Sequence, residues 1–168
     1  FELEDKGCSL KASAEGHVYR QGYFLGDGTG AGKGRQVASV ILDRWVRGER
    51  RHIWISKNEA LLEDARRDWA ALGGLPIDIQ PLSSWKLGTP IAMRDGILFV
   101  TYPTLRSGRN DATRLDQILA WAGEDFDGVI VFDEAHAMAH AAGGAGSRGK
   151  VKGSQPGIAG VRLQNLLP

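Results

Sequence analysis

Short apolar runs that alternate with longer helical segments are the feature that most constrains how this chain can fold. Four runs rich in Val, Ile and Phe are nearly continuous in hydrophobicity, at residues 22–26, 52–56, 97–102 and 129–133. A fifth run, at residues 77–82, is interrupted by Pro81. Continuous apolarity is typical of strands that are covered on both faces, as in parallel sheets. The pattern therefore predicts an α/β fold of three layers, α/β/α, with helices on both faces of a mostly parallel sheet.

Apolar residues spaced three and four apart predict a helix after each of the first two strands. In the first helix, the residues that would face the sheet are Val37, Val40, Ile41 and Trp45. The second helix would begin with a capping box of Ser56 and Glu59 and end at Gly73 and Gly74.

Two further helices are predicted in the second half of the chain. One runs from about Asp111 to Gly123, and the other covers residues 158–167 and packs through Val161 and Leu166. Residues 141–157 are rich in glycine, carry several positive charges and lack periodicity. We expect a mobile basic loop there rather than a linker between domains.

Length and composition indicate a single globular domain, residues 1–168. The chain has 42% hydrophobic and 24% charged residues and can bury one core without disulfides. Its longest apolar run is far shorter than the ~20 residues that cross a bilayer, so no membrane partner is expected. The single cysteine, Cys8, cannot form an internal disulfide. This favours a reducing compartment, which is the cytoplasm for a bacterial or phage protein and the nucleus for a eukaryotic one.

The net charge of +1 argues against a chain that binds nucleic acid through overall basicity. Its clearest basic cluster comprises Arg44, Arg47, Arg50 and Arg51. We interpret this cluster as solvated surface charge.

The stretch GDGTGAGKGRQ, residues 26–36, lies between the first strand and the first helix, which is the context of a phosphate-binding loop. Backbone amides of such a loop and the N-terminus of the helix can hold a polyphosphate, and Lys33 would add a positive charge. The residues that we expect at the nucleotide are Asp27, Gly28, Thr29, Gly30, Ala31, Gly32, Lys33, Gly34 and Arg35. A flexible turn that joins strand to helix is the structural alternative.

This loop departs from the pattern G-x-x-x-x-G-K-[ST] at two positions. Asp27 stands at the first glycine position, and Gly34 replaces the hydroxyl residue that would contact Mg²⁺. A water molecule bridging from Asp133, or the hydroxyl of Thr29, could fill the place of the missing hydroxyl.

The segment VIVFDEAH, residues 129–136, ends an apolar strand with two adjacent carboxylates. In an ATPase with a phosphate-binding loop, an acid at the end of a neighbouring strand holds Mg²⁺, and the next acid can orient or deprotonate the attacking water. Asp133 fits the first role and Glu134 the second. Together the two motifs predict a site for ATP and Mg²⁺ at the carboxyl edge of the sheet.

With both motifs, the chain resembles the first RecA-like domain of a superfamily 2 helicase, and more narrowly the strawberry notch family. The resemblance extends through most of the chain, in the blocks GYFLGDGTGAGKGRQ, RHIWISKNEALLEDARRDWAALG, ILFVTYPTLRS, TRLDQILAWAGEDFDGVIVFDEAHAMAH and GVRLQNLLP. The family itself carries glycine after the loop lysine, which favours a working nucleotide site over a flexible turn.

The resemblance implies a DEAH-type, nucleic-acid-dependent ATPase that uses ATP and Mg²⁺ and acts on DNA or RNA. Lys33 matches the loop lysine of the family. Asp133 matches the Mg²⁺ ligand and Glu134 the catalytic acid. His136 matches the histidine that couples hydrolysis to the nucleic acid and the partner domain.

Two further segments match the family's contacts to the nucleic-acid backbone, which position a strand without reading its sequence. Their residues are Ser56, Lys57, Thr101 and Thr104. A capping role for Ser56 and a place in the strand alone for Thr101 are the alternatives.

Related helicases also need a second RecA-like domain, which supplies an arginine to the transition state, and a Ser-Ala-Thr segment after the DEAH strand. Neither is evident in residues 1–168, nor is the upstream glutamine that contacts adenine, because Gln21 lies too close to the loop. We therefore expect the domain alone to turn over little ATP. The alternative function is a nucleotide-binding interaction module for transcription or chromatin partners, without strand separation.

Two other functions fit the sequence poorly. His136 and His140 are spaced to share a helix face, but no third zinc ligand accompanies them. A small-molecule kinase would have no role for the DEAH segment and the blocks around it.

Overall fold

A four-stranded parallel sheet forms the centre of the computed structural model, which describes residues 2–3, 10–11, 22–28, 30–109, 112–138, 144–146, 149–151 and 154–167. The strand order is β4 (Ile79–Pro81), β5 (Gly96–Thr101), β3 (Arg51–Ser56) and β8 (Ile130–Phe132). β3 pairs with β5 over its whole length and with β8 over three residues. β3 lies inside the sheet, and five of its six residues are buried, as is typical of a strand covered on both faces.

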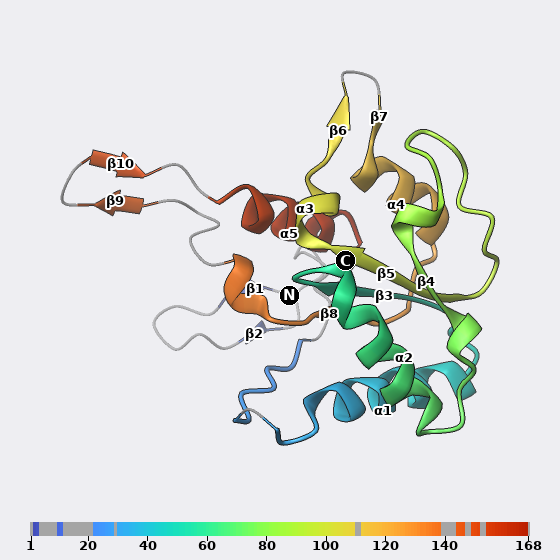
Figure 1. Cartoon of the computed structure of the whole chain (residues 1–168). Helices are drawn as coiled ribbons and strands as arrows, with labels where there is room; N and C mark the ends of the chain where they lie inside the picture. The colour runs from blue at the N-terminus through green and yellow to red at the C-terminus, as the bar shows by residue number, and fades with distance from the viewer. Residues whose placement is uncertain are drawn as a thin grey trace.

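Helices cover both faces of this sheet (Figure 1). On one face lie α1 (Lys33–Val46) and α2 (Leu62–Ala70), and on the other lie α3 (Tyr102–Leu105), α4 (Arg114–Ala122) and α5 (Gln155–Leu166). Neighbouring residues of β3 point into different cores: Trp54 packs with the first group of helices, Ile53 and Ile55 with the second. The predicted three-layer α/β fold with a parallel sheet is confirmed.

Short elements connect these layers. The 3-10 helices are η1 (Glu59–Leu61), η2 (Pro76–Asp78), η3 (Leu82–Ser84) and η4 (Ala135–Met138). Antiparallel pairs are β1 (Glu2–Leu3) with β2 (Leu10–Lys11), β6 (Gly108–Arg109) with β7 (Ala112–Thr113), and β9 (Gly144–Gly146) with β10 (Gly149–Val151). The last pair and the start of α5 lie within residues 141–157, for which mobility stays a prediction. No described helix combines the length and apolarity that a membrane span requires.

The predicted strand at residues 22–26 was wrong. These residues have no regular structure, and Tyr23 and Phe24 are 89% and 82% exposed. Among the described strands, β8 is an edge strand that pairs only with β3, and residues 22–26 do not pair with its other side. Apolar and aromatic residues favour a strand only where a partner supplies hydrogen bonds and packing.

Of the four residues of α1 predicted to face the sheet, Val37, Ile41 and Trp45 pack in or against the core, and only Val40 does not. Ala38 and Ile41 are fully buried, while Val40 is 51% exposed. Ala38 contributes to this face in place of Val40, and the spacing of large apolar residues alone does not indicate a buried alanine.

The prediction that α5 packs through Val161 and Leu166 was also wrong, because these side chains are 44% and 48% exposed. Leu163 and Leu167 are buried instead. The physical reason is Gly160, where a Cβ atom would lie 2.4 Å from Sδ of Met138. The glycine allows α5 to pack closely against η4, and this contact selects the buried face.

The predicted capping box of Ser56 and Glu59 does not form, since η1 separates β3 from α2. A capping box appears instead at α4, where the hydroxyl of Thr113 accepts from the amide of Asp116 and the Asp116 carboxylate accepts from the amide of Thr113. Asp111, where this helix was predicted to begin, lies outside the described residues.

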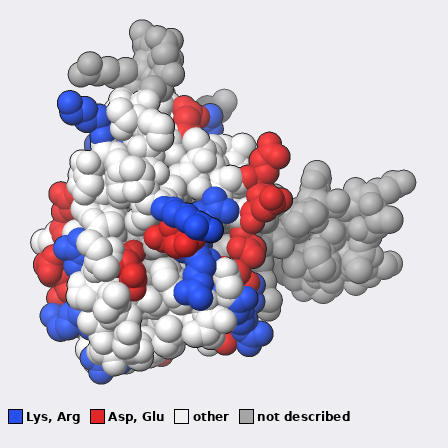
Figure 2. All heavy atoms as spheres, turned by 90° about the vertical axis from the view of Figure 1, so that its right-hand side faces the viewer, with Lys and Arg blue, Asp and Glu red and all other residues white. Residues whose placement is uncertain are grey.

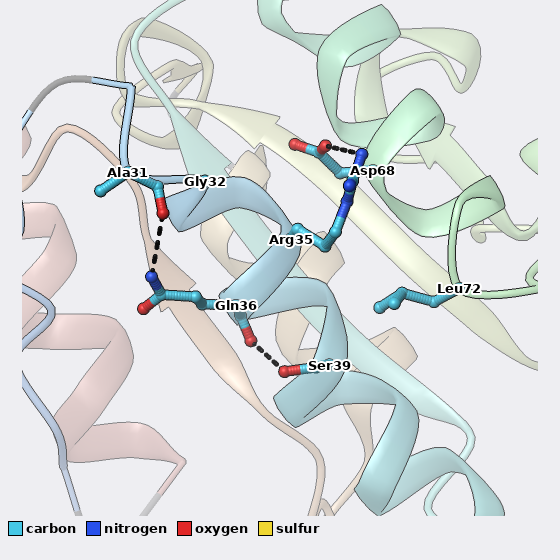
Figure 3. A pocket seen from close by; sticks show the side chains of 7 residues that line it. All are labelled: Ala31, Gly32, Arg35, Gln36, Ser39, Asp68 and Leu72. Carbon is cyan, nitrogen blue, oxygen red and sulfur yellow. Dashed lines mark hydrogen bonds and ion pairs between the residues drawn. The ribbon is translucent and has the colours of Figure 1, made fainter.

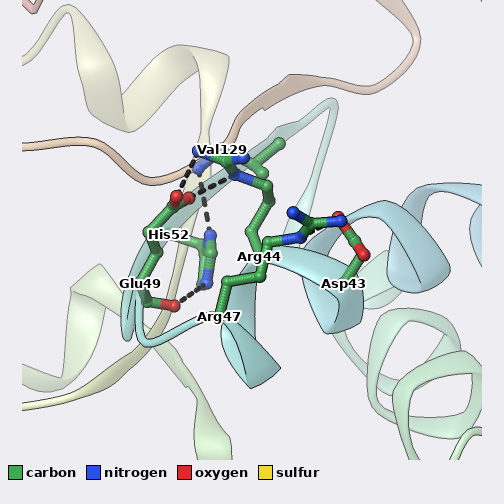
Figure 4. Close-up of polar contacts among 6 residues, drawn as sticks. All are labelled: Asp43, Arg44, Arg47, Glu49, His52 and Val129. Carbon is green, nitrogen blue, oxygen red and sulfur yellow. Dashed lines mark hydrogen bonds and ion pairs between the residues drawn. The ribbon is translucent and has the colours of Figure 1, made fainter.

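His52 closes the amino end of the sheet (Figure 4). Its ring is fully buried; Nε2 donates to the carbonyl of Glu49 at 2.8 Å, and Nδ1 accepts from the amide of Val129 at 3.0 Å. Burial is the main cause that lowers the pKa of His52 to about 4. The neutral ring therefore ties the turn before β3 to the segment that leads into β8.

The basic cluster around this end contacts other parts of the domain. Arg44 pairs with Glu49, Arg47 pairs with Asp43 at 3.0 Å, and Arg51 donates to the carbonyl of Trp121 at 2.9 Å. On the face in Figure 2, described basic side chains lie beside acidic ones rather than forming one large basic surface.

Candidate nucleotide site at the carboxyl edge of the sheet

Three parallel strands end side by side and hold Asp133 between them. Asp133 follows β8 and donates its backbone N–H to the carbonyl of Ile55 at 2.8 Å. Ser56, the last residue of β3, donates its hydroxyl to Oδ2 of Asp133 at 2.9 Å. Tyr102, which follows β5, donates its hydroxyl to the Asp133 carbonyl at 2.9 Å. Ser56 thus positions the carboxylate of Asp133, while Ile55 and Tyr102 hold its backbone.

Tyr102 is a residue of this edge that the sequence prediction missed. Its side chain is 2% exposed. Burial raises the pKa of Tyr102, and the negative charges of Asp133 and Glu134 raise it further. The phenol therefore keeps its proton and remains a hydrogen-bond donor. Its position directly after an apolar strand was the available signal.

Glu134 has an unusual backbone conformation. Its φ is 52°, which places a non-glycine residue in the left-handed region. Its carboxylate oxygen Oε2 lies 3.1 Å from Nδ1 of His136, and both side chains are substantially exposed, at 48% and 67%. Strained backbone of this kind is typical of functional sites, because the surrounding structure must maintain it.

Lys33, at the start of α1, folds back over the glycine-rich loop. Its ammonium group donates to the carbonyls of Asp27 and Gly28 at 2.8 and 2.9 Å. Gly30 and Gly32 have φ values of 84° and 73°, which glycine adopts without strain. The loop therefore turns tightly around the lysine that would meet phosphate oxygens.

Asp27 and Gln36 connect the two ends of this loop. Nε2 of Gln36 donates to Oδ2 of Asp27 at 3.1 Å and to the carbonyl of Ala31 at 3.2 Å. Asp27 does not have a positive φ. A glycine is therefore not required at this position of the motif, and the aspartate adds a contact that a glycine cannot make.

A pocket of about 530 Å³ opens beside the loop, between α1 and α2 (Figure 3). Its lining consists of Ala31, Gly32, Arg35, Gln36, Ser39, Asp68 and Leu72. Asp68 comes from α2, far from the loop in sequence, and the sequence prediction did not include it.

The structure brings only some of the predicted site residues into direct contact. Ser56 contacts Asp133, and His136 contacts Glu134, as described above. Among the described residues, no hydrogen bond or ion pair joins the loop at 26–36 to these acids. In Figure 1 the chain leading into α1 and the η4 turn both lie on the left side of the molecule. Thr29 lies outside the described residues.

The predicted nucleic-acid contacts differ in how available they are. Ser56 is fully buried against Asp133. The Thr101 hydroxyl accepts from the amide of Thr104 at 3.3 Å and lies 2.8 Å from the Thr104 hydroxyl, so it caps α3. Lys57 is exposed.

No three His, Cys, Asp or Glu side chains gather into a metal site within the described part of the chain. His140, the second member of the histidine pair, lies outside that part. The zinc alternative is therefore not tested by the described residues.

Comparison with known proteins gives one family. The family model described as "P-loop containing NTP hydrolase pore-1" matches residues 4–168. Strawberry notch homolog 1 of Gallus gallus is 39% identical over 158 residues, and strawberry notch homolog 2 of Homo sapiens is 42% identical over 153 residues. FORGETTER 1 of Arabidopsis thaliana is 36% identical over 154 residues.

Each of these matches covers 89% of the chain but only 10–12% of the relative, so the chain spans about a tenth of the length of these proteins. No solved structure matches the chain. The match over residues 4–168, a loop built around Lys33 and a carboxylate fixed at the end of β8 agree with one another. The chain therefore belongs to the strawberry notch family of P-loop NTP hydrolases.

Proposed function

We propose that this domain binds ATP with Mg²⁺ and, in the full-length protein, couples ATP hydrolysis to movement on DNA or RNA. The observation that carries the proposal is the fixed position of Asp133 at the carboxyl edge of the sheet. In open α/β sheets, ligands bind outside the carboxyl ends of the strands. Membership of a P-loop NTP hydrolase family supports the nucleotide part of the proposal.

The residues at this edge fit Mg²⁺, which prefers hard oxygen ligands. One oxygen of Asp133 accepts from Ser56, and the other takes no hydrogen bond within the described residues. The chemistry that the ion would supply is positive charge that offsets the charge of the phosphate groups. Asp133 would hold the ion, and Lys33 would bind the β- and γ-phosphates.

Glu134 would orient and deprotonate the attacking water. Its carboxylate is 48% exposed, so a water molecule can reach it. His136 contacts that carboxylate, so a change at His136 would reach the catalytic acid directly. This contact supports a coupling role for His136 between hydrolysis and a partner domain.

The nucleic acid would lie along the ends of β3 and β5. Lys57 is exposed there and would bind a phosphate, while Ser56, Thr101 and Thr104 would shape the backbone that carries it. A second RecA-like domain would complete the site with the arginine that stabilises the transition state.

A nucleotide-binding interaction module is the second candidate, and one observation favours it. The Ser56 and Thr101 hydroxyls are engaged inside the domain, and Arg44 and Arg47 pair with acids. Some of the hydroxyl and basic side chains that could contact a phosphate backbone are therefore engaged within the domain, which would suit ATP binding without strand movement.

Binding of a fluorescent ATP analogue to the purified chain tests the nucleotide site. Lys33→Ala should abolish binding, while Arg47→Ala, a matched loss of one cation on α1, should leave it unchanged. Equal binding by wild type and Lys33→Ala would contradict the proposal.

Hydrolysis by the full-length protein separates the motor from the module. A motor should hydrolyse ATP faster when DNA or RNA is added, and Glu134→Gln should lower the rate about 100-fold or more. Nucleotide binding without stimulated hydrolysis would favour the module.

A further inference from the structure

Asp68 of α2 occupies the space of the side chain that Gly34 lacks. A Cβ atom built on Gly34 would lie 2.1 Å from Oδ2 and 3.2 Å from Cγ of Asp68. Real Cβ atoms essentially never approach other atoms within 3.0 Å. A side chain at position 34 would therefore require the Asp68 carboxylate to move.

The atom that fills this space is an oxygen. In a serine or threonine the hydroxyl oxygen is one bond from Cβ, so Oδ2 of Asp68 takes up part of the space around that Cβ in which such a side chain would lie. The hydroxyl of the usual loop contacts Mg²⁺ there. A carboxylate oxygen is an equally suitable hard ligand.

The electrostatic surroundings leave this carboxylate available. α1 has no acidic residue in its first turn, and its N-cap, Gly32, makes no side-chain cap. Nη2 of Arg35 lies 3.9 Å from Oδ1 of Asp68, and this distance is too long for a hydrogen bond. The Arg35 side chain is also 59% exposed. The Asp68 carboxylate is thus only loosely paired and keeps capacity to accept from a water or bind a cation.

Asp68 also lines the same pocket as the end of the loop (Figure 3). A ligand in this pocket would contact both Gly32 and Asp68. Mg²⁺ usually takes one or two protein carboxylates and completes its shell with phosphate and water. A single carboxylate beside the phosphate loop satisfies that requirement.

We propose that Asp68 supplies, from α2, the oxygen that holds the nucleotide's Mg²⁺ beside Gly34. The inference rests on the proposed ATP site. In it, Asp68 takes the place of the loop hydroxyl, and Asp133 keeps its own proposed role. This arrangement also explains why glycine and an acid occur together: the acid needs the room that glycine leaves.

The test measures the affinity of the purified chain for a fluorescent ATP analogue, with Mg²⁺ and with EDTA. Asp68→Asn and Asp68→Ala should lose the Mg²⁺-dependent gain in affinity, by about 10- to 100-fold, with the affinity in EDTA unchanged. The matched control is Asp64→Asn on the same helix. Asp64 pairs with Arg67 at 2.8 Å and is 50% exposed, so its loss should change neither affinity.

A second pair of variants tests the exchange of oxygens directly. Gly34→Ser alone should lower the melting temperature, because its Cβ collides with Asp68. Adding Asp68→Ala should restore both the fold and the Mg²⁺-dependent gain, since the Cβ of residue 68 lies at an ordinary contact distance of 3.8 Å.

The possible results are distinct. Retention of the Mg²⁺-dependent gain in both Asp68 variants would overturn the inference and leave the ATP site intact. Equal loss of affinity with and without Mg²⁺, together with a lower melting temperature, would also overturn it in favour of a purely structural Asp68. If wild type binds no nucleotide through Lys33, the proposed ATP site fails, and the inference fails with it.

Discussion

At each end of β3 a buried polar side chain forms a hydrogen bond to the β8 segment. The two ends differ in whether a polar group there remains able to bind a further partner. At the amino end, His52 uses both ring nitrogens, one toward Glu49 and one toward Val129. At the carboxyl end, Ser56 gives its one hydrogen bond to Asp133, whose second carboxylate oxygen stays available within the described residues.

This difference separates a structural contact from a candidate functional one. A neutral ring with both nitrogens satisfied has no further partner to bind and can only hold strands together. A carboxylate that is fixed but incompletely satisfied can bind a cation at little cost in reorganisation. The amino end of β3 thus only holds strands together, whereas its carboxyl end positions a group that can bind a cation.

The largest expected effect is at the amino end. His52→Ala should lower the free energy of unfolding by about 4 kcal/mol, because it leaves a cavity and two buried backbone groups without partners. Urea unfolding at pH 7.5 measures it. A loss of nucleotide affinity in the folded variant would contradict the purely structural role of this end.

Lowering the pH should reduce the free energy of unfolding by a comparable amount, because the buried His52 is neutral in the folded chain. The pKa of His52 is about 4 in the folded chain and 6.5 ordinarily, so the unfolded chain takes up the proton first. The contribution of His52 is complete above pH 6.5 and is lost as the pH falls from 6.5 to 4, by roughly 3 kcal/mol in total. Urea unfolding at several pH values should show a shallower dependence in His52→Gln; parallel curves would refute the assignment.

At the carboxyl end, Ser56→Ala should lower the free energy of unfolding by about 2 kcal/mol, the usual value of a hydrogen bond to a charged group. Unlike changes at His52, it should also weaken nucleotide affinity in Mg²⁺ more than in EDTA, because Asp133 loses its orientation. Ser83→Ala serves as a control, since it also removes a hydroxyl bonded to a carboxylate, but its partner is Glu59 and not Asp133. An equal loss of nucleotide affinity in Mg²⁺ and in EDTA would contradict a role of Ser56 in orienting Asp133 and would leave it a structural role, like that of His52.

The smallest effect is expected at Tyr102. Tyr102→Phe removes one hydrogen bond to the Asp133 carbonyl and should cost about 1 kcal/mol in the free energy of unfolding. Urea unfolding beside Tyr23→Phe, an exposed control, checks this value. A cost as large as that of His52→Ala would show that the phenol supports more than this backbone contact.

The sequence predicted the parts of the molecule that depend on local pattern. Buried strands at β3, β5 and β8 follow from continuous apolarity, and Asp133 follows from its place at a strand end. Residues 22–26 show the same apolarity but have no neighbouring strand, and pairing is not a local property. Ser56 and Thr113 likewise both match a capping pattern, and only tertiary contacts decide that Thr113 caps a helix.

Contacts between distant segments could not be predicted in this way. Asp68 reaches Gly34 only because α1 and α2 pack on one face of the sheet. Nothing in the sequence around either residue indicates the other. The missing hydroxyl of the loop could be recognised from the motif, but the oxygen in its place comes from another helix.

The left-handed backbone at Glu134 affects which substitutions evolution can accept at this position. A residue with a side chain pays roughly 1–2 kcal/mol in that region, and glycine would relieve the cost. The variant that best stabilises this turn is therefore also the one that deletes the acid. Selection for thermal stability alone would replace the glutamate with glycine, and retention of glutamate there would indicate selection for chemistry.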